Sequence, residues 1–515
     1  METELKLLVH PNDAHMLRHH PLLAQYAVEP PREQTLSGIY FDTKEYDLRR
    51  ADAGLRVRQV NQDWVQTLKA GGTAVAGLHE RHEWESIVTG PIPDLDALRR
   101  QIDPKSSYAK LIKHLGKRSQ LIPTFTTSIT RTVWNLRLPE GDEVECVIDR
   151  GSIDTDDSKT PVSELELELK SGDPTHLFDL ALRLQDDVPM QIGNFSKADR
   201  GYGLVRRQAT DAVQAAPIRL SPRMTIESAF KTIVLSCLDQ VQSNEPGVTI
   251  HHDVEHLHQM RVGLRRLRSA LALFKSVIAC PESITVELSW LGTILSQARD
   301  WDVLHGSTLP AIRHSVSDPD LLESLHEAVR ARATACHETA AATLGSSRYT
   351  KLILRFYRWV QAAEWRGGRS ADQRRQLERP VVRFARTILL HDQRRLLRRG
   401  QQLQHADAGA RHGVRIAAKK ARYGIEFFES LYSKKQVRPY LQSLSLLQDQ
   451  LGALNDAAVG RTLLRALEAS HPQLRVEAAF IWGYMTCRLD QDLPHLNTAW
   501  KRFKATSLPK AQHHQ

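Results

Sequence analysis

The chain has 515 residues, of which 41% are apolar and 25% charged, and its formal net charge is +10. A chain of this length exceeds a single hydrophobic core, so two or three domains are expected. The sequence holds no apolar stretch near the roughly 18–20 residues that cross a bilayer, and its start, METELKLLV, lacks the pattern of a secretory signal. These features predict a soluble globular protein with no membrane partner.

Five cysteines are spread along the chain without a C-x-x-C pair. This spacing argues against a zinc site or a disulfide framework and predicts a protein of the reducing cytoplasm. The charge is divided unevenly, because residues 1–205 carry about 25 basic and about 32 acidic side chains, which leaves the rest of the chain near +17. A basic half predicts an anionic partner, such as nucleic acid, an anionic membrane or a polyphosphate.

Short runs in which apolar and polar residues alternate follow one another up to about residue 205. AGLRVRQV, DWVQTLKA and SELELELK are examples, and turn residues such as Gly71-Gly72 separate several of them. Alternation at period two is typical of β-strands, and many short strands at close spacing predict an antiparallel sheet or barrel. Helical patches are expected at residues 94–101 and 175–185.

The pattern changes after a small, polar, proline-containing stretch at residues 206–222, which we interpret as a linker between domains 1–205 and 223–510. Beyond it, apolar residues recur at the helical period of 3.6. The second half is therefore expected to be all-helical.

Two basic segments of the helical half share one pattern. HQMRVGLRRLR begins at residue 258 and HGVRIAAKKAR at residue 412, and both fit H-x-x-R-x-x-x-[RK]-[RK]-x-R. We therefore expect two repeats, at about 223–370 and 371–510, packed with pseudo-twofold symmetry.

Carboxylates alternate with leucines in SELELELK. Glu164, Glu166 and Glu168 share one strand face, where like charges repel, and METELK has a similar alternation. If the sheet closes into a barrel, one face of each strand lines the interior. Carboxylates bind hard divalent cations and arginines bind phosphate oxygens, so such an interior suits a metal-chelated chain of phosphates.

The ordered motifs METELK, GLRVRQ, QTLK, GLHERHEW, CVIDRGSI, ELELELKSGD and SKADRGY resemble the CYTH family, also called triphosphate tunnel metalloenzymes. The helical half, with its two histidine-and-arginine motifs, resembles the CHAD domain, and the order of the two resembles bacterial CYTH–CHAD tandem proteins. The resemblance implies an α+β multidomain fold: an eight-stranded antiparallel barrel with flanking helices, then an all-α domain.

The resemblance also implies that the barrel hydrolyses a triphosphate with Mg²⁺ or Mn²⁺, and the tandem order favours inorganic triphosphate, cleaved to diphosphate and phosphate. Lys197 and Glu83 are the catalytic candidates. The general base is either a tunnel glutamate or Lys197 with a depressed pKa, and simple phosphate binding is the other role open to Lys197. The metal candidates are Glu2, Glu4, Asp149, Glu164, Glu166 and Glu168. Which two of Glu164, Glu166 and Glu168 bind the ion stays open. The substrate-binding candidates are Lys6, Arg56, Arg58, Lys69, Arg81, Arg131 and Arg200.

Each basic motif of the helical half places its histidine and three cations at i, i+3, i+7 and i+10, on one helix face. Two such faces brought together form a cationic groove that suits a linear polyanion. The resemblance to CHAD implies inorganic polyphosphate, with possible association with polyphosphate granules. The candidates are His258, Arg261, Arg265, Arg266 and Arg268 in the first motif and His412, Arg415, Lys419, Lys420 and Arg422 in the second.

Other functions stay open from the sequence. The barrel could hold phosphate chains without cleaving them, although a mere polyanion binder gains little from so many carboxylates. It could also act on thiamine triphosphate or cyclise ATP. Nucleic-acid binding ranks below these functions, because the basic half shows no recognised nucleic-acid motif and no interleaved aromatic residues.

Overall fold

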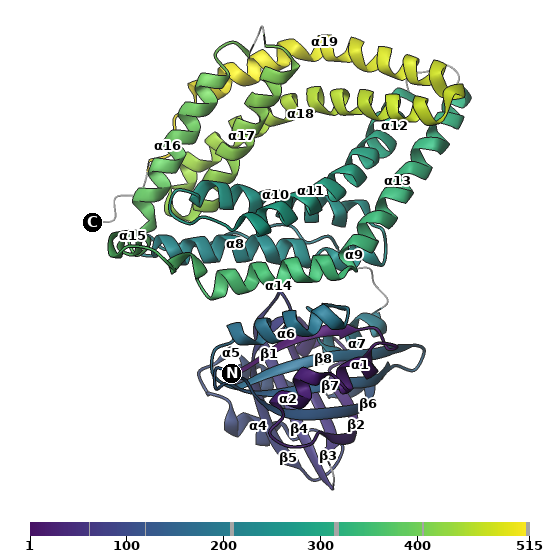
Figure 1. Ribbon diagram of the computed structural model, residues 1–515, viewed down its shortest axis with the longest axis vertical. Helices are drawn as coiled ribbons and strands as arrows, with labels where there is room; N and C mark the ends of the chain where they lie inside the picture. The colour runs from purple at the N-terminus through teal and green to yellow at the C-terminus, as the bar shows by residue number, and fades with distance from the viewer. Residues whose placement is uncertain (61, 119, 207–210, 314–318, 404–405, 511–515) are drawn as a thin grey trace. The chain divides into compact units, whose positions relative to one another are not determined.

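The structure, a computed structural model, describes residues 1–60, 62–118, 120–206, 211–313, 319–403 and 406–510. It divides into two compact units. The first comprises Met1–Thr210 with Gly345–Ala362, and the second comprises Asp211–Leu344 with Ala363–Gln515. Figure 1 shows the strands of the first unit and the helices of the second.

The strands of the first unit form a closed antiparallel barrel. Their order is β5-β4-β3-β2-β6-β7-β8-β1, β1 pairs back onto β5, and the short β9 adds to β1. This closure confirms the predicted eight-stranded barrel. The strands are β1 (Glu2–Val9), β2 (Arg32–Asp42), β3 (Ala53–Val60), β4 (Asp63–Val75), β5 (Leu78–Val88), β6 (Ile122–Arg137), β7 (Glu143–Asp154), β8 (Lys159–Ser171) and β9 (Met190–Ile192).

Helices cover the barrel from outside, where the apolar face of each strand needs burial. Leu55 and Val57 of β3 are fully buried in a cluster with Leu98 of α4. Because neighbours along a strand point to opposite faces, Arg56 and Arg58 lie on the inner side. The helices of this unit are α1 (Ala14–Arg18), α2 (Pro21–Tyr26), α3 (Asp47–Arg50), α4 (Leu95–Gln101), α5 (Ser107–Arg118), α6 (Thr175–Asp187), α7 (Lys197–Arg206) and α14 (Ser347–Gln361).

Apolar side chains fill one end of the barrel interior. Tyr40 stacks on Phe125 with ring centroids 4.5 Å apart, and Phe125 meets Tyr202 of α7 edge-on at 5.3 Å. Leu36 and Ile129 belong to the same buried cluster. Helix α7 therefore lies against this end and begins next to the charged part of the interior.

One helix from the second half of the sequence belongs to the barrel unit. In α14, Tyr357 stacks on Phe178 of α6 with ring centroids 5.1 Å apart, and Lys351 Nζ lies 2.6 Å from Asp186 Oδ1. The amphipathic sequence of α14 predicts a helix but not which core the helix joins.

The second unit is all-helical, as the 3.6-residue period predicts. Helices α10 and α17, which carry the two basic motifs, pack against each other, and each also packs against the helix that follows it, α11 or α18. The elements are α8 (Ile226–Gln242), α9 (Glu245–Thr249), α10 (Val254–Phe274), α11 (Glu282–Val303), η1 (Leu304–Thr308), α12 (Leu309–Arg313), η2 (Pro319–Leu322), α13 (Glu323–Leu344), η3 (Glu364–Arg366), α15 (Ala371–Leu377), α16 (Val381–Arg399), α17 (Ala408–Phe428), η5 (Glu429–Leu431), α18 (Lys434–Ser470), η6 (Pro472–Leu474) and α19 (Arg475–Ala505).

The predicted linker at 206–222 includes residues 207–210, which lie outside the described residues. Residues 211–221 run without regular secondary structure. The buried Asn244 side chain accepts a hydrogen bond from the Val213 N–H at 3.0 Å and donates one to the Val213 carbonyl at 2.9 Å. This contact holds the segment against α8 and α9.

Within the described part of the chain, none of the helices combines the length and the apolar character that crossing a membrane requires.

Candidate functional site

A cavity of about 240 Å³ lies inside the barrel. Acidic and basic side chains from strands all round the wall line it, together with the start of α7. Most of the barrel residues that the sequence singles out lie here. The charged lining residues are Glu2, Glu4, Lys6, Arg49, Asp52, Arg56, Arg58, Lys69, Arg81, Glu83, Glu85, Arg131, Glu145, Glu166, Glu168, Lys170, Lys197 and Asp199.

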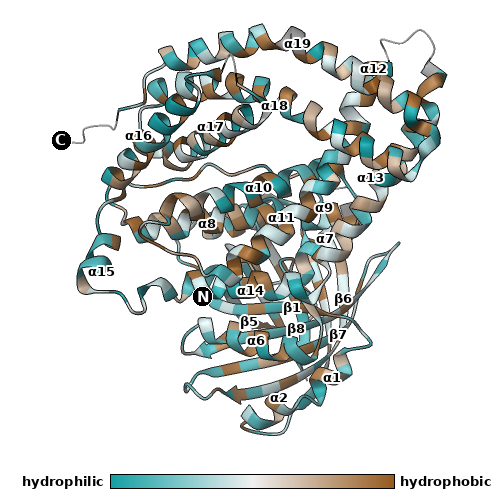
Figure 2. Cartoon of the chain, turned by 45° about the horizontal axis from the view of Figure 1, so that its top comes forward, coloured by the Kyte–Doolittle hydropathy of each residue, from teal (hydrophilic) through white to brown (hydrophobic). Residues whose placement is uncertain are grey.

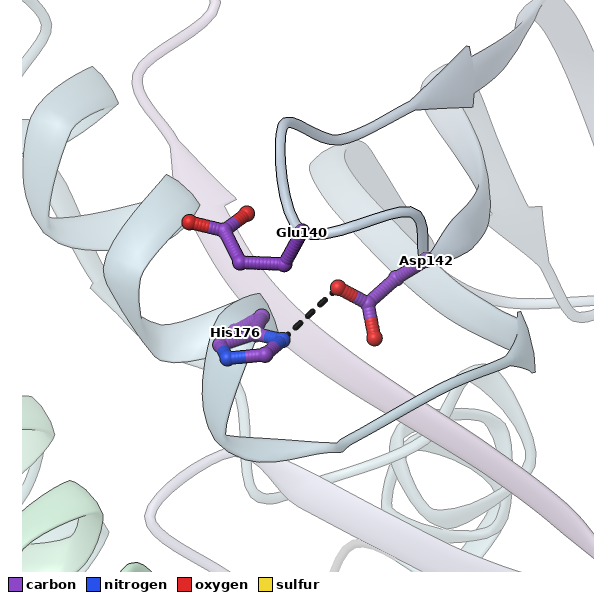
Figure 3. Close-up of side chains that lie close together, drawn as sticks. All are labelled: Glu140, Asp142 and His176. Atoms are coloured by element: carbon purple, nitrogen blue, oxygen red, sulfur yellow. Dashed lines mark hydrogen bonds and ion pairs between the residues drawn. The ribbon is translucent and has the colours of Figure 1, made fainter.

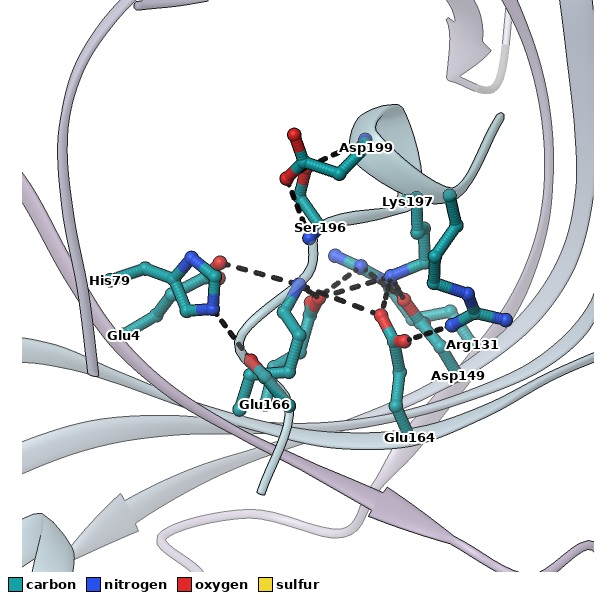
Figure 4. Close-up of polar contacts among 12 residues, drawn as sticks. Glu4, His79, Arg131, Asp149, Glu164, Glu166, Ser196, Lys197 and Asp199 are labelled. Atoms are coloured by element: carbon teal, nitrogen blue, oxygen red, sulfur yellow. Dashed lines mark hydrogen bonds and ion pairs between the residues drawn. The ribbon is translucent and has the colours of Figure 1, made fainter. Parts of the chain in front are cut away.

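The first residue of α7 places its ammonium group among buried carboxylates (Figure 4). Lys197 Nζ lies 2.6 Å from Asp149, 2.5 Å from Glu164 and 3.0 Å from Glu166. Burial alone lowers the pKa of a lysine, but these carboxylates outweigh it and raise the pKa of Lys197 above its ordinary value. The raised pKa disfavours the alternative in which Lys197 is the general base, because its ammonium group stays protonated.

Two more cations neutralise the same carboxylates. Lys6 Nζ donates to Glu166 at 2.6 Å, and Arg131 donates to both oxygens of Asp149 at 2.7 and 2.6 Å and to Glu166 at 3.1 Å. Burial opposes the ionisation of Glu166, but the surrounding cations outweigh it and hold its pKa well below the usual range. The same balance lowers the pKa of Asp149. Both side chains are therefore carboxylates at neutral pH.

A second group of charges surrounds the N-terminal strand. Lys69 donates to the two oxygens of Glu2 at 2.8 and 2.6 Å and lies 3.5 Å from Glu83. Burial raises the pKa of Glu2 to about 7. The nearby charge of Glu4 also raises this pKa, whereas the ammonium group of Lys69 lowers it. The Glu2 carboxylate therefore exchanges its proton near neutral pH.

Two arginines of β3 face the cavity side by side. Arg56, together with burial, lowers the pKa of Arg58 to about 10. The Nε atoms of both are buried, and among the described residues neither has a hydrogen-bond partner. Arg58 has one ion-pair partner, Glu85, at 3.6 Å. A bound anion would relieve the repulsion between the two guanidinium groups, so this part of the wall suits phosphate oxygens.

The glutamates of β8 fall into two groups. Glu166 and Glu168 line the cavity, whereas Glu164 is fully buried behind it, held by Lys197 and by Arg200 Nη1 at 2.9 Å. Asp149 and Arg200 likewise lie outside the main cavity. All three glutamates form ion pairs, since Glu166 also contacts Lys6 and Arg131 and Glu168 lies 2.7 Å from Lys170, but Glu164 is the one that does not line the cavity.

The cavity also contains residues that the sequence patterns do not single out. Asp199 accepts from the Ser196 N–H at 2.9 Å and pairs with Arg49 and, at 3.6 Å, with Arg81. His79 lines the cavity too, and its Nε2 lies 2.7 Å from the Gly193 carbonyl. Asp199 stands inside the SKADR motif and His79 inside GLHERHEW, so both could have been found there, whereas Arg49 stands in no recognisable pattern.

A fully buried carboxylate fixes α7 in place. Tyr202 donates to Asp42 Oδ2 at 2.8 Å. The Asp42 carboxylate also accepts from the backbone N–H groups of Thr43, Leu48 and Arg49 at 2.7 to 3.0 Å, where α3 begins. The position of Lys197, at the start of α7, therefore depends on this hub.

A separate group of possible ligands lies where the β6–β7 turn meets α6 (Figure 3). The side chains of Glu140, Asp142 and His176 converge there. Asp142 Oδ2 lies 2.7 Å from His176 Nδ1, and its Oδ1 accepts from the Asp173 N–H at 2.7 Å. Since the fold uses both oxygens of Asp142, these contacts join the turn to the helix.

In the helical unit, cations of α10 and α17 approach each other. Burial, followed by Arg265, Arg415 and Arg261, lowers the pKa of Lys419 to about 7. Asp456 lies 4.0 Å from Arg415 and compensates only part of this charge. We call Arg261, Arg265, Arg415 and Lys419 the paired-helix cluster. Its mutual repulsion makes it suitable for an anion.

The other basic candidates of this unit have different surroundings. Arg266 is buried, donates to Gln240 at 2.8 Å and lies over the Phe427 ring, so it packs inside the unit. Arg422 donates to Glu426 at 2.7 Å. Arg268 and His412 are exposed, and His258 and Lys420 are half-buried.

Residues 1–202 match the family model of the CYTH domain, and residues 232–465 match that of the CHAD domain. This chain belongs to the proteins in which a CYTH domain precedes a CHAD domain. The chain is 31% identical over 207 residues to an inorganic triphosphatase of Haemophilus influenzae, a stretch that covers 40% of this chain and 56% of that protein. It thus matches only about half the length of that relative.

The solved CHAD domain of the plant Ricinus communis is similar at 37% sequence identity and a TM-score of 0.54, covering 59% of this chain and all of that chain.

Replacing Tyr202 by Phe tests the hub that holds α7 in the CYTH domain. The change removes one donor to a buried carboxylate and keeps the ring contacts with Phe125. We expect the free energy of unfolding of the CYTH domain to fall by about 1.5–3 kcal/mol, the usual loss for a hydrogen bond to a charged group. Urea denaturation followed by circular dichroism measures it. A variant as stable as the wild type would show that the backbone donors alone hold Asp42.

Proposed function

We propose that the CYTH domain hydrolyses inorganic triphosphate to diphosphate and phosphate with Mg²⁺ or Mn²⁺, and that the CHAD domain binds inorganic polyphosphate. The observation that carries the first part is the cavity itself. Four glutamates line it from the adjacent strands β1 and β8, which also contribute Lys6 and Lys170, and the charged lining of β3, β4 and β6 is cationic. A cavity that offers grouped carboxylates for a cation and arginines and lysines for phosphate oxygens complements a metal-bound phosphate chain.

The carboxylates of β1 and β8 fit a hard divalent cation. Glu4 lies opposite Glu168 in the strand register, and Glu166 is the next inward residue on β8. All of these donors are oxygens, which Mg²⁺ and Mn²⁺ prefer. We propose that Glu2, Glu4, Glu166 and Glu168 hold the ion, while Asp149 and Glu164 stay paired with Lys197. When bound, the ion neutralises phosphate oxygens and lowers the pKa of water.

The protein's own side chains then position the substrate and balance its charge. Arg56 and Arg58, which repel each other without an anion, bind phosphate oxygens. The protonated Lys197 and Arg131 line the cavity next to the buried carboxylates and stabilise charge that develops on the transferred group. With Lys197 protonated, we assign proton abstraction from water to a tunnel glutamate, and Glu83, in the cavity beside Lys69, is the candidate.

The lining favours an inorganic triphosphate over an organic one. Among the described lining residues, the aromatic side chains are Tyr40, His79 and Tyr202. Tyr40 and Tyr202 already contact Phe125 in the apolar cluster. The cavity therefore offers phosphate contacts but little surface on which a base or a thiamine ring could stack.

Neutralising one carboxylate of the cavity tests the metal site. In Glu166→Gln and Glu168→Gln, we expect phosphate release from inorganic triphosphate to fall by roughly 100-fold or more, because each change removes a charged group from the reacting centre. The Mg²⁺ concentration that gives half-maximal rate should rise in Glu168→Gln. A malachite-green assay with triphosphate, thiamine triphosphate, ATP and long polyphosphate, each with Mg²⁺ and Mn²⁺, measures the rates.

Glu143→Gln is the matched control, because Glu143 stands on β7, is exposed and pairs with Arg137 outside the cavity. It should keep the wild-type rate. Full activity in both cavity variants, or wild-type turnover of thiamine triphosphate or ATP above that of triphosphate, would contradict the proposal. A protein that binds triphosphate without releasing phosphate would be the non-catalytic binder.

The paired-helix cluster supports polyphosphate binding by the CHAD domain. Its four cations are partly buried, so a phosphate chain that replaces water there gains strong charge-assisted contacts. Such binding would also account for an association with polyphosphate granules.

The pKa of Lys419 makes this binding depend on pH. The folded pKa of about 7 lies below the ordinary lysine value, so Lys419 loses its proton as the pH rises through 7. We expect the affinity for polyphosphate to fall by about three- to tenfold between pH 6 and 8.5, since the anion binds the protonated form. In Lys419→Arg, whose side chain stays charged, this dependence should shrink. Isothermal titration calorimetry at several pH values measures both. An identical pH profile in the variant would rule out Lys419 as the group whose titration makes binding depend on pH.

A further inference from the structure

Helix α16 presents an unusual surface, outside the two basic motifs. Its buried side carries Val381, Ala385, Leu389 and Leu396. Its exposed positions carry arginine, apart from one threonine and one histidine. We call the exposed residues Arg383, Arg386, Arg394 and Arg398 the α16 stripe. Arg383 and Arg398 are 15 residue steps apart, or about 22 Å along the helix.

The stripe has no acidic counterpart. Among the described residues, no carboxylate lies within ion-pair distance of its four arginines, and the one acid of α16, Asp392, is buried on the opposite side. Other exposed helices of this unit mix both signs, as α13 does with Glu323, Glu327 and Arg330. The stripe therefore differs from an ordinary solvated helix face.

The fold gives no reason for this accumulation of charge. Like charges one turn apart, as in Arg394 and Arg398, destabilise a helix. The helix dipole favours cations only in the last turn, which accounts for Arg398 but not for Arg383, Arg386 or Arg394. An external anion would remove the repulsion that the fold leaves in place.

The chemistry of the exposed positions points to a ligand that offers phosphate charge alone. Thr387 and His391 are the other exposed residues before the last turn, so the exposed positions provide no apolar side chain for lipid tails and no large aromatic ring for nucleic-acid bases. Arginine rather than lysine occupies every cationic position of the stripe, and its guanidinium group binds phosphate oxygens in pairs.

Helix α16, which carries the stripe, is a neighbour of α17, which carries Arg415 and Lys419 of the paired-helix cluster. The pKa of Lys420 in α17 is lowered mainly by burial. The nearby charges of Arg395 and Arg399 in α16 lower it further. Cations therefore continue from the motif helix onto α16.

We propose that the α16 stripe is a second contact surface for linear inorganic polyphosphate, which long chains reach in addition to the paired-helix cluster. The inference rests on the proposed polyphosphate binding and adds a dependence on chain length. A chain long enough to occupy both surfaces binds more tightly than a short one, because the second contact is made within the same complex.

The test uses the full-length protein and the variant R383Q/R386Q/R394Q/R398Q. We expect its affinity for labelled long-chain polyphosphate to fall by roughly tenfold or more, and the slope of log K against log salt to decrease by about 0.7 for each lost contact. Binding of a chain too short to span both surfaces should stay unchanged. Fluorescence anisotropy at several salt concentrations gives both quantities, and thermal melting shows whether the variant is folded.

The matched control is R330Q/R332Q/R475Q/R488Q, which removes the same charge from exposed positions on α13 and α19. It should retain nearly all of the affinity and slope. Equal losses of affinity in the two variants would overturn the proposed role of the stripe and leave the cluster as the polyphosphate site. A wild-type protein that binds no polyphosphate would overturn the proposed function as well.

Three further probes distinguish other polyanions. Duplex DNA, RNA and phosphatidylserine vesicles are compared with polyphosphate at equal phosphate and salt concentrations. Preferential binding of any of them, lost in the stripe variant, would overturn the proposal in favour of that partner.

Discussion

The first unit depends on charge compensation inside a closed barrel. Asp149, Glu164 and Glu166 have almost no exposure, and such carboxylates are tolerated only where cations neutralise them. Lys6 and Lys197 supply that neutralisation from two different elements. If either strand closure or the docking of α7 failed, buried charges would be left unpaired. The fold and the candidate site therefore share one physical requirement.

The position of Lys197 is the weakest part of this arrangement, because a helix rather than a strand supplies it. Strand residues are fixed by the register of the sheet, but α7 is fixed by side chains. The Asp42–Tyr202 hydrogen bond and the apolar cluster around Phe125 provide this attachment. The geometry of the charged cavity thus depends on the apolar end of the barrel as well as on the ion pairs within it.

The same electrostatic feature occurs in both units. In each, the fold holds cations close together and leaves them partly uncompensated: Arg56 and Arg58 in the barrel, and Arg265 and Lys419 in the helical unit. Repulsion of this kind disfavours the charged form and is relieved by an anionic ligand. This repulsion and burial together lower the pKa values of Arg58 and Lys419, a feature that the two otherwise unrelated folds share.

The sequence by itself determined the periodicities, and through them both folds. Alternation in SELELELK and 3.6-residue repetition around HQMRVGLRRLR follow from local geometry, which each segment carries in its own residues. Tertiary structure decided the rest. Glu164, Glu166 and Glu168 are equivalent in the sequence, but the docking of α7 pairs Glu164 with Lys197 and leaves Glu168 at the cavity. The raised pKa of Lys197 and the cavity position of Arg49 also depend on contacts between residues far apart in the chain, because burial and the charges of neighbours exist only once the barrel has closed.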